Sequence, residues 1–520
     1  MLATLAKSNQ WKRLALGRFC SGSVDAPTKI IVEKLKHASK DGDWKTALGT
    51  FQHFVASFPQ AVEPYHANLV LRVCAAHGRH REAKKVLHTM QQIGLKELNA
   101  AATTTTEAPN STAGAHATLE SKALMCIALI ENGKGHDALQ TLQTQASEAL
   151  AATTDDEATR RALNGLVYKP IIQALKNKND WKLTLTVLHH MQGFGLPISL
   201  RGYRMLFLAL ASGRQNEKLV DVTDQVLRLR GDVLDVATYT VLFKTLSALG
   251  EHEAVDRVLD QIAATKPSEW MQTSTDVNFY NALIRAKMLS GQLDYCLARL
   301  KEMEGALAPD AFPYTTCMLG FLNTDKSFVI FKLYKDMLAR DIAPSILTLA
   351  LVLRAIKTSP KQRKLIPAIV RTLETTPLEK SDFVHTVIDA LEELRERDAS
   401  HVVFERAMDE NMLGEWRKGL YAMNLHSFSR GSAKAAVEFA LLAIAEQPKS
   451  VLKTELQDLK IITGKGRGSR EYMKPVLKPK IITMLRKHFR LIAFSPAQNE
   501  GSLVVKKANL EAYIDTYHGE

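Results

Sequence analysis

The 520-residue chain is poor in the residue types that build metal centres and disulfide frameworks. Its five cysteines are far apart and form no Cys-x-x-Cys pair: Cys20, Cys74, Cys126, Cys296 and Cys317. A structural zinc site needs ligands at short spacings, and a disulfide framework usually needs a dense, even set of cysteines. We therefore expect reduced cysteines that pack inside the protein.

Long apolar runs are also absent, and so are acidic residues in the first 24 positions. No apolar run approaches the ~18 residues that indicate a membrane-spanning helix, so we expect none. Lys7, Lys12, Arg13 and Arg18 are instead interspersed with apolar residues and serines. A basic, amphipathic segment without acids is typical of a mitochondrial presequence. We expect residues 1–24 to be such a presequence, with a plastid transit peptide as the alternative.

Basic residues outnumber acidic ones by 68 to 55, which gives a formal net charge of +13. An excess of this size favours polyanionic partners such as nucleic acid; a basic leader with an ordinary solvated surface is the alternative. The excess is densest near the C-terminus, where ten basic residues and the single acid Glu471 lie between Lys460 and Arg490. This stretch is therefore expected to contact nucleic acid.

From about residue 28 to residue 410 the chain repeats a pair of helical patterns with a period of about 35 residues. In the clearest units, Val277 to Asp310 and Ala311 to Ser345, tyrosines and methionines recur at matching places: Tyr280 and Tyr314, Met303 and Met337. One helix pair cannot bury its apolar faces alone, so about eight to ten pairs should stack into an α-α superhelical solenoid with these side chains in its core. We expect the Ala/Thr-rich stretch 97–118 to be a flexible loop.

The unit resembles the pentatricopeptide repeat (PPR), in which the residue after the tyrosine and the last residue of the repeat read one RNA base. The resemblance implies three base-reading pairs: Thr240 with Asp276, Asn281 with Asp310, and Thr315 with Ser345. The corresponding residues Lys169 and Arg204 do not fit the family's code; they contact phosphate or are ordinary solvated positions. The alternative is a tetratricopeptide-type array, in which the concave groove of the solenoid binds protein instead of RNA.

Residues 418–508 alternate short β-prone runs with helical runs, the pattern of a small α/β domain. A first strand leads to Met423-Asn424-Leu425-His426, and a later one leads to a glycine-rich basic loop: Thr463, Gly464, Lys465, Gly466, Arg467 and Gly468. The segment resembles the Smr (small MutS-related) domain, with its LDxH-type and TGxG motifs. The resemblance implies that the loop contacts phosphate and that His426 and Asn424 occupy the catalytic positions, although Asn424 stands where the family has aspartate.

Taken together, the sequence predicts a mostly α protein with four parts: a presequence (1–24), a repeat array (28–410), an Smr domain (418–508) and a C-terminal tail (509–520). It resembles organellar PPR-SMR proteins. We expect a mitochondrial RNA-binding protein that acts in RNA processing, stability or translation, with single-stranded RNA, the mitochondrial ribosome or other RNA-processing proteins as partners. The alternatives are a site-specific endoribonuclease and a protein-binding scaffold. No cofactor is predicted, except a divalent metal if the protein is a nuclease.

Overall fold

The computed structural model describes most of the chain: residues 26–101, 111–151, 156–175, 178, 180–448, 452, 454–464, 477–497 and 499–519. The predicted presequence and residues 465–468 of the glycine-rich loop lie outside the described residues. The chain divides into two compact units, residues 1–245 and 246–520, and each is considered by itself. None of the described helices is long and apolar enough to cross a membrane.

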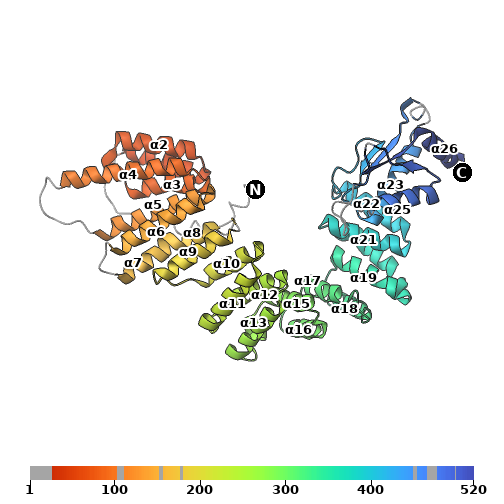
Figure 1. The fold of residues 1–520 in the computed structure, drawn as a ribbon, viewed down its shortest axis with the longest axis horizontal. Helices are drawn as coiled ribbons and strands as arrows, with labels where there is room; N and C mark the ends of the chain where they lie inside the picture. Colours follow the sequence, from red (N-terminus) through yellow and green to blue (C-terminus); the bar gives the residue numbers. More distant parts are fainter. Residues whose placement is uncertain are drawn as a thin grey trace. The chain divides into compact units, whose positions relative to one another are not determined.

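Consecutive helix pairs follow one another along the array, as predicted (Figure 1). Those of the first unit are α1 (Ala26–Asp41) with α2 (Trp44–Ser57), α3 (Pro64–Ala76) with α4 (His80–Ala101), α5 (Ser111–Glu131) with α6 (Gly135–Ala151), α7 and α8 (Asp156–Ala162, Lys169–Leu175) with α9 (Trp181–Gly193), and α10 (Leu200–Ser212) with α11 (Asn216–Arg230). The division between the units falls in α12 (Val236–Leu249), which is followed by α13 (His252–Thr265) and the short α14 (Trp270–Ser274). The second unit continues with α15 (Val277–Leu289) and α16 (Leu293–Ala306), α17 (Ala311–Phe321) and α18 (Phe328–Ala339), α19 (Ile346–Thr358) and α20 (Ile366–Thr375), and α21 (Ser381–Leu394) and α22 (Arg397–Asp409). The described residues thus contain ten helix pairs, within the predicted range.

The repeated tyrosines and methionines are buried, which confirms their predicted place in the core. Tyr168, Tyr239, Tyr280 and Tyr314 are fully buried, and so are Met191, Met303 and Met337. The tyrosine hydroxyls keep polar partners: that of Tyr280, for example, donates to Glu302 Oε1 at 2.9 Å. The four described cysteines are also buried and free, and burial raises the pKa of Cys74 to about 11. The expectation of reduced, packing cysteines is confirmed for these four.

The polar residue that ends a repeat caps the first helix of the next one. Ser199 Oγ accepts from Gly202 N, Asp276 Oδ1 from Phe279 N, Asp310 Oδ1 from Phe312 N, and Ser345 Oγ from Thr348 N. Such caps satisfy backbone N–H groups that have no partner within the helix. At the other end of α15, Gly291 has a φ of +76°, a left-handed conformation that glycine adopts without strain. Local chemistry therefore sets where these helices begin and end.

Two predicted irregular segments are partly or wholly helical. Residues 97–101 continue α4 and residues 111–118 begin α5, so only 102–110 of the predicted loop lie outside the described residues. Residues 509–519 of the predicted tail are instead part of α26 (Lys507–Gly519), because Leu510 and Ile514 are buried in the domain core; Glu520 lies outside the described residues.

The C-terminal domain is built on a four-stranded mixed sheet in the order β1-β2-β4-β3. Its strands are β1 (Ala422–Asn424), β2 (Leu459–Ile462), β3 (Ala493–Phe494) and β4 (Ser502–Val505). β1 runs parallel to β2, and β4 is antiparallel to both β2 and β3. The helices α23 (Arg430–Ala445), α25 (Leu477–His488) and α26 contribute buried apolar residues to the same core as the inward side chains of the strands. The mostly α fold with a small α/β domain at its C-terminus is confirmed.

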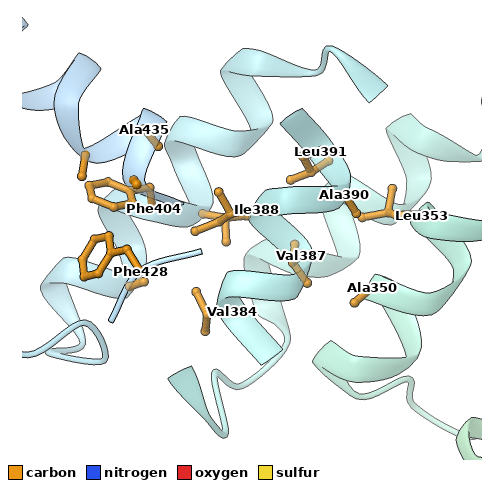
Figure 2. Packing of buried hydrophobic residues seen from close by; sticks show 14 of the residues in the cluster. Ala350, Leu353, Val384, Val387, Ile388, Ala390, Leu391, Phe404, Phe428 and Ala435 are labelled. Atoms are coloured by element: carbon orange, nitrogen blue, oxygen red, sulfur yellow. The ribbon is translucent and has the colours of Figure 1, made fainter. Parts of the chain in front are cut away.

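One hydrophobic core runs from the last helix pairs into the C-terminal domain (Figure 2). Phe404 of α22 lies at the junction, with ring centroids 5.6 Å from Trp416, 6.5 Å from Phe428 and 6.1 Å from Phe439. Figure 2 also shows side chains of α19, α21 and α23 in this cluster, among them Leu353, Ile388 and Ala435. The domain is therefore packed onto the array rather than tethered to it.

Polar contacts fix the orientation of this junction. Asp389 Oδ1 on α21 accepts from Gly431 N at 2.6 Å and from Ser429 Oγ at 2.7 Å, so it caps α23 across the junction. A Cβ at Gly431 would lie 2.6 Å from the same oxygen, and only glycine allows this approach. His401 Nε2 lies 2.8 Å from Glu438 Oε2, and this hydrogen bond raises the pKa of His401. The two carboxylates thus join the last helix pair to α23.

We predict that Phe404→Ala destabilises the last repeats and the C-terminal domain together. Removing a fully buried phenylalanine typically costs about 3–5 kcal/mol, and this ring belongs to the core that both parts share. Denaturant unfolding should show one shifted transition for both parts. Val402→Ala on the same helix, where the valine is 47% exposed, should change stability by less than ~0.5 kcal/mol. Separate transitions for the two parts would contradict a shared core.

Candidate nucleic-acid interface

The two sequence motifs of the C-terminal domain meet at one edge of its sheet. β1 and β2 are parallel, so their carboxyl ends lie side by side, and the pairing continues with Leu425 N donating to Ile462 O at 2.8 Å. His426 is the residue directly after Leu425. Gly464, in the loop after β2, comes so close that a Cβ on it would lie 3.4 Å from His426 Cβ. The predicted proximity of the histidine and the glycine-rich loop is present in the structure.

His426 is exposed, and Asn424 orients its ring. His426 Nδ1 lies 2.9 Å from Asn424 Oδ1. An amide oxygen only accepts hydrogen bonds, so Nδ1 carries the proton and Nε2 is left with its lone pair. Asn424 therefore selects the tautomer that an aspartate would select, but it adds no negative charge to stabilise a protonated ring.

Thr463 and Gly464 position the loop instead of offering backbone donors to a phosphate. Thr463 N and Gly464 N both donate to Gly501 O, at 2.9 and 3.0 Å, and Gly501 N donates in turn to Asn499 Oδ1 at 3.2 Å. These two N–H groups are therefore engaged within the protein, and the phosphate contact of Thr463 and Gly464 stays a prediction. Lys465, Gly466, Arg467 and Gly468, which share that expectation, lie outside the described residues.

Lys478 adds a cation to this edge that the sequence did not single out as a site residue. It lies in the first turn of α25, and its Nζ donates to Glu500 O and to Ser495 Oγ, both at 2.7 Å. Glu500 is the neighbour of Gly501, whose carbonyl holds the loop. The sequence places Lys478 only within a basic run, because its contact with residues 495–500 depends on how α25 packs against β3 and β4.

A cleft of about 390 Å³ lies between α21, α23 and α25. Its lining combines acidic, basic and apolar side chains: Asp389, Glu392, Glu393, Arg430, Gly431, Lys434, Leu477, Lys480, Ile481 and Met484. Glu392 and Lys434 form an ion pair in it. Nowhere in the described residues do three His, Cys, Asp or Glu side chains gather in a way that could hold a metal ion.

The predicted base-reading positions differ in how far their polar groups are already engaged. The Asn281 side-chain oxygen is buried and has no hydrogen-bond partner in the described part of the chain. The Thr315 hydroxyl, by contrast, lies 2.7 Å from both Ala311 O and Thr348 Oγ1, and Ser345 Oγ lies 3.0 Å from the same Thr348 Oγ1. The Thr315 and Ser345 pair therefore forms a closed network in the protein, which leaves little hydrogen-bonding capacity for a base.

The remaining candidate residues of the repeats also differ in whether their polar groups already have partners within the protein. The Thr240 hydroxyl donates to Val236 O at 2.8 Å, and Asp276 caps α15. Arg204 forms an ion pair with Asp235, with Nη1 2.8 Å from Oδ2, so its charge is balanced within the protein instead of being free for phosphate. Lys169 opens α8. Asn281 with Asp310 is thus the pair with the most hydrogen-bonding capacity left for a ligand.

We predict that Gly464→Ala displaces His426 and destabilises the domain. Gly464 has a φ of +79°, where an alanine costs roughly 1–2 kcal/mol, and the new Cβ would press on His426. The matched control is Gly414→Ala, at φ +63° with no atom within 4 Å of its Cβ. Both variants should lose similar stability in denaturant unfolding, but only Gly464→Ala should shift the His426 ring resonances in NMR spectra. Unchanged His426 resonances would contradict the contact.

Two family models each match a part of the chain. The family model of the Smr domain matches residues 423–506, and that of the PPR repeat matches residues 65–95, which covers α3 and most of α4. The second match falls outside the units whose sequence pattern is clearest. No curated protein matches the chain.

Several solved structures are similar to the chain at low sequence identity. The pentatricopeptide repeat protein PPR10 from maize is 17% identical, with 96% of this chain and 62% of that chain covered and a TM-score of 0.39. PPR10 in complex with an RNA element is 13% identical, with 80% and 58% covered and the same TM-score. The chain thus spans less than two thirds of these proteins. Yeast Rmd9p in complex with its target RNA is 9% identical, with 87% and 98% covered and a TM-score of 0.29.

The two family matches agree with the helix pairs and with the mixed sheet that brings His426 next to Gly464. The chain therefore carries a PPR repeat within its helical array and an Smr domain at its C-terminus.

Proposed function

We propose that the protein binds single-stranded RNA, with its repeats reading bases and its Smr domain holding the RNA backbone nearby. The observation that carries this proposal is the half-buried amide of Asn281, whose side-chain oxygen has no hydrogen-bond partner among the described residues. An acceptor without a partner costs about 1–3 kcal/mol, and a rotation of this amide towards a donor on a base edge would remove that cost. Uracil offers such a donor in its ring N–H. The resemblance to the PPR family likewise implies a preference for uracil at the pair Asn281 with Asp310.

The second half of the pair is also free to bind. Asp310 Oδ1 caps α17 through Phe312 N, while its other carboxylate oxygen has no hydrogen-bond partner among the described residues. At the Smr edge, the exposed His426 and the anchored Lys478 supply a donor or acceptor and a positive charge for the RNA backbone. The net charge of +13 favours the same partner.

The cellular setting is part of the same proposal. The basic leader without acids supports a mitochondrial location, with a plastid as the alternative, and the RNA would then be an organellar transcript. In that setting the protein acts in RNA processing, stability or translation, and the mitochondrial ribosome or other RNA-processing proteins are its partners. A scaffold that binds protein without reading bases is the competing outcome of the test below.

We predict that Asn281→Ala and Asp310→Ala each weaken RNA binding and relax selectivity at one base. Losing one base-edge hydrogen bond should reduce affinity about 10-fold. Selection from mixed-sequence RNA, followed by sequencing of the bound fraction, should show loss of a uridine preference at one position. The controls are Asn323→Ala and Asp325→Ala, the same changes at exposed positions between α17 and α18. Binding that depends on salt but is indifferent to Asn281 and Asp310 would leave only electrostatic attachment.

The contact between His426 and Asn424 favours endonuclease activity as a second candidate function. The free Nε2 can accept the proton of an attacking 2′-hydroxyl, and Lys478 can stabilise the charge that develops on the phosphate. Asn424 lacks the negative charge with which an aspartate would stabilise the imidazolium that forms when Nε2 takes this proton. The protein is therefore a binder first, and any cleavage should be slow.

We predict that Asn424→Asp raises RNA cleavage, by up to ~100-fold if the missing charge is what limits the proton transfer. His426→Ala should abolish that cleavage, whereas His488→Ala, at an exposed histidine at the end of α25, should not. Labelled single-stranded RNA would be incubated with the full chain, with and without magnesium. If no cleavage that depends on His426 appears in either background, the endonuclease candidate is wrong and RNA binding stands alone.

A further inference from the structure

We propose that the outward face of the Smr sheet is a platform on which bases of the bound RNA stack, with Phe494 as the stacking residue. This inference rests on the proposed RNA-binding function and names a surface for it. The strand register places Ala422, Lys460, Val504 and Phe494 in one row across all four strands. Side chains alternate between the faces of a sheet, so these four share a face.

The burial pattern shows which face this is. Leu459, Ile461, Leu503 and Val505 alternate with the row and are fully buried in the domain core. Lys460 is exposed, Phe494 is 40% exposed, and Ala422 and Val504 are partly exposed. Ile492, two residues before Phe494, is 68% exposed. The row therefore lies on the side of the sheet opposite the helices, with an aromatic ring in contact with solvent.

The charges beside this ring suit RNA. Lys506 Nζ lies 5.2 Å from the Phe494 ring centroid and also forms an ion pair with Asp458. Lys478 is bonded to Ser495, the residue after Phe494. The side-chain ammonium of Lys460, in the middle of the row, has no ion-pair or hydrogen-bond partner within the described part of the chain. An exposed aromatic ring with cations nearby is the combination that binds single strands, because the ring stacks on a base and the cations attract phosphates.

The platform continues into the edge that carries His426. Asn424 and Ile462 pair in register one row further along the strands, on the same face, and Asn424 holds the His426 ring. Phe494 and the β1 strand are three strand spacings apart, about 14 Å at roughly 4.8 Å per strand. A strand of RNA with one base on Phe494 can therefore cross the sheet past Lys460 and place its backbone at His426.

The test compares aromatic and aliphatic residues at position 494 in the full chain. The probe is mixed-sequence single-stranded RNA with a fluorescent adenine analogue that stacking quenches. Phe494→Leu should weaken binding at least ~5-fold and relieve the quenching, while Phe494→Tyr should preserve both. Lys460→Gln should weaken binding and reduce its salt dependence by about one phosphate contact.

Two controls separate this surface from the rest of the molecule. Tyr517→Leu removes an aromatic ring of nearly the same exposure, 39%, from α26, and Lys335→Gln removes an exposed charge from α18. Neither should change the quenching. Ultraviolet crosslinking followed by mass spectrometry should recover the peptide that contains Phe494 joined to RNA.

The outcomes distinguish this inference from the function on which it rests. If the wild-type chain binds no RNA, the proposed function fails. If it binds RNA but Phe494→Leu matches the wild type in affinity, quenching and crosslinking, the platform is wrong and the RNA is held elsewhere. A Phe494→Leu variant that binds RNA normally but loses a protein partner would assign this face to protein instead.

Discussion

The packing of Phe404 against Trp416, Phe428 and Phe439 is the interaction on which the arrangement of the C-terminal half depends. These aromatic side chains come from α22 and from the Smr domain, so neither part completes its core without the other. The carboxylate of Asp389 fixes the orientation of the domain on α21, because it can cap α23 in one orientation only. The His426 edge is consequently held at a fixed position relative to the last repeats.

Much of the candidate site could be predicted from the sequence, because parallel strands bring their carboxyl ends to one edge. The motif at His426 and the loop at Gly464 each follow a β-prone run, and the structure brings them into contact. The roles of Thr463 and Gly464 could not be predicted in the same way. Their N–H groups bond to Gly501 O, and that partner depends on how β4 pairs with β2, which the local sequence does not encode.

The repeats show the same limit. The helical period predicts that Tyr280 and Tyr314 are buried, since both recur at the same place in the apolar pattern of their repeats. The engagement of Thr315 with Thr348 joins two successive repeats, so it depends on how closely they stack. The helix α26 was missed because only two of its inward residues, Leu510 and Ile514, are strongly apolar and buried. In each case the outcome depends on tertiary contacts, which the local sequence pattern does not reveal.

If the array reads bases as proposed above, the caps at its repeat boundaries limit how its base preference can evolve. Asp276, Asp310 and Ser345 each hold the start of the next helix, and replacing a residue of this kind with alanine typically costs about 0.5–2 kcal/mol. Only a few residue types both cap a helix and present a polar group outward. Changes of target sequence are therefore easier at Asn281, which caps nothing, than at Asp310. During evolution such an array should vary first at the residue after the tyrosine. The last residue of each repeat should remain aspartate, asparagine, serine or threonine.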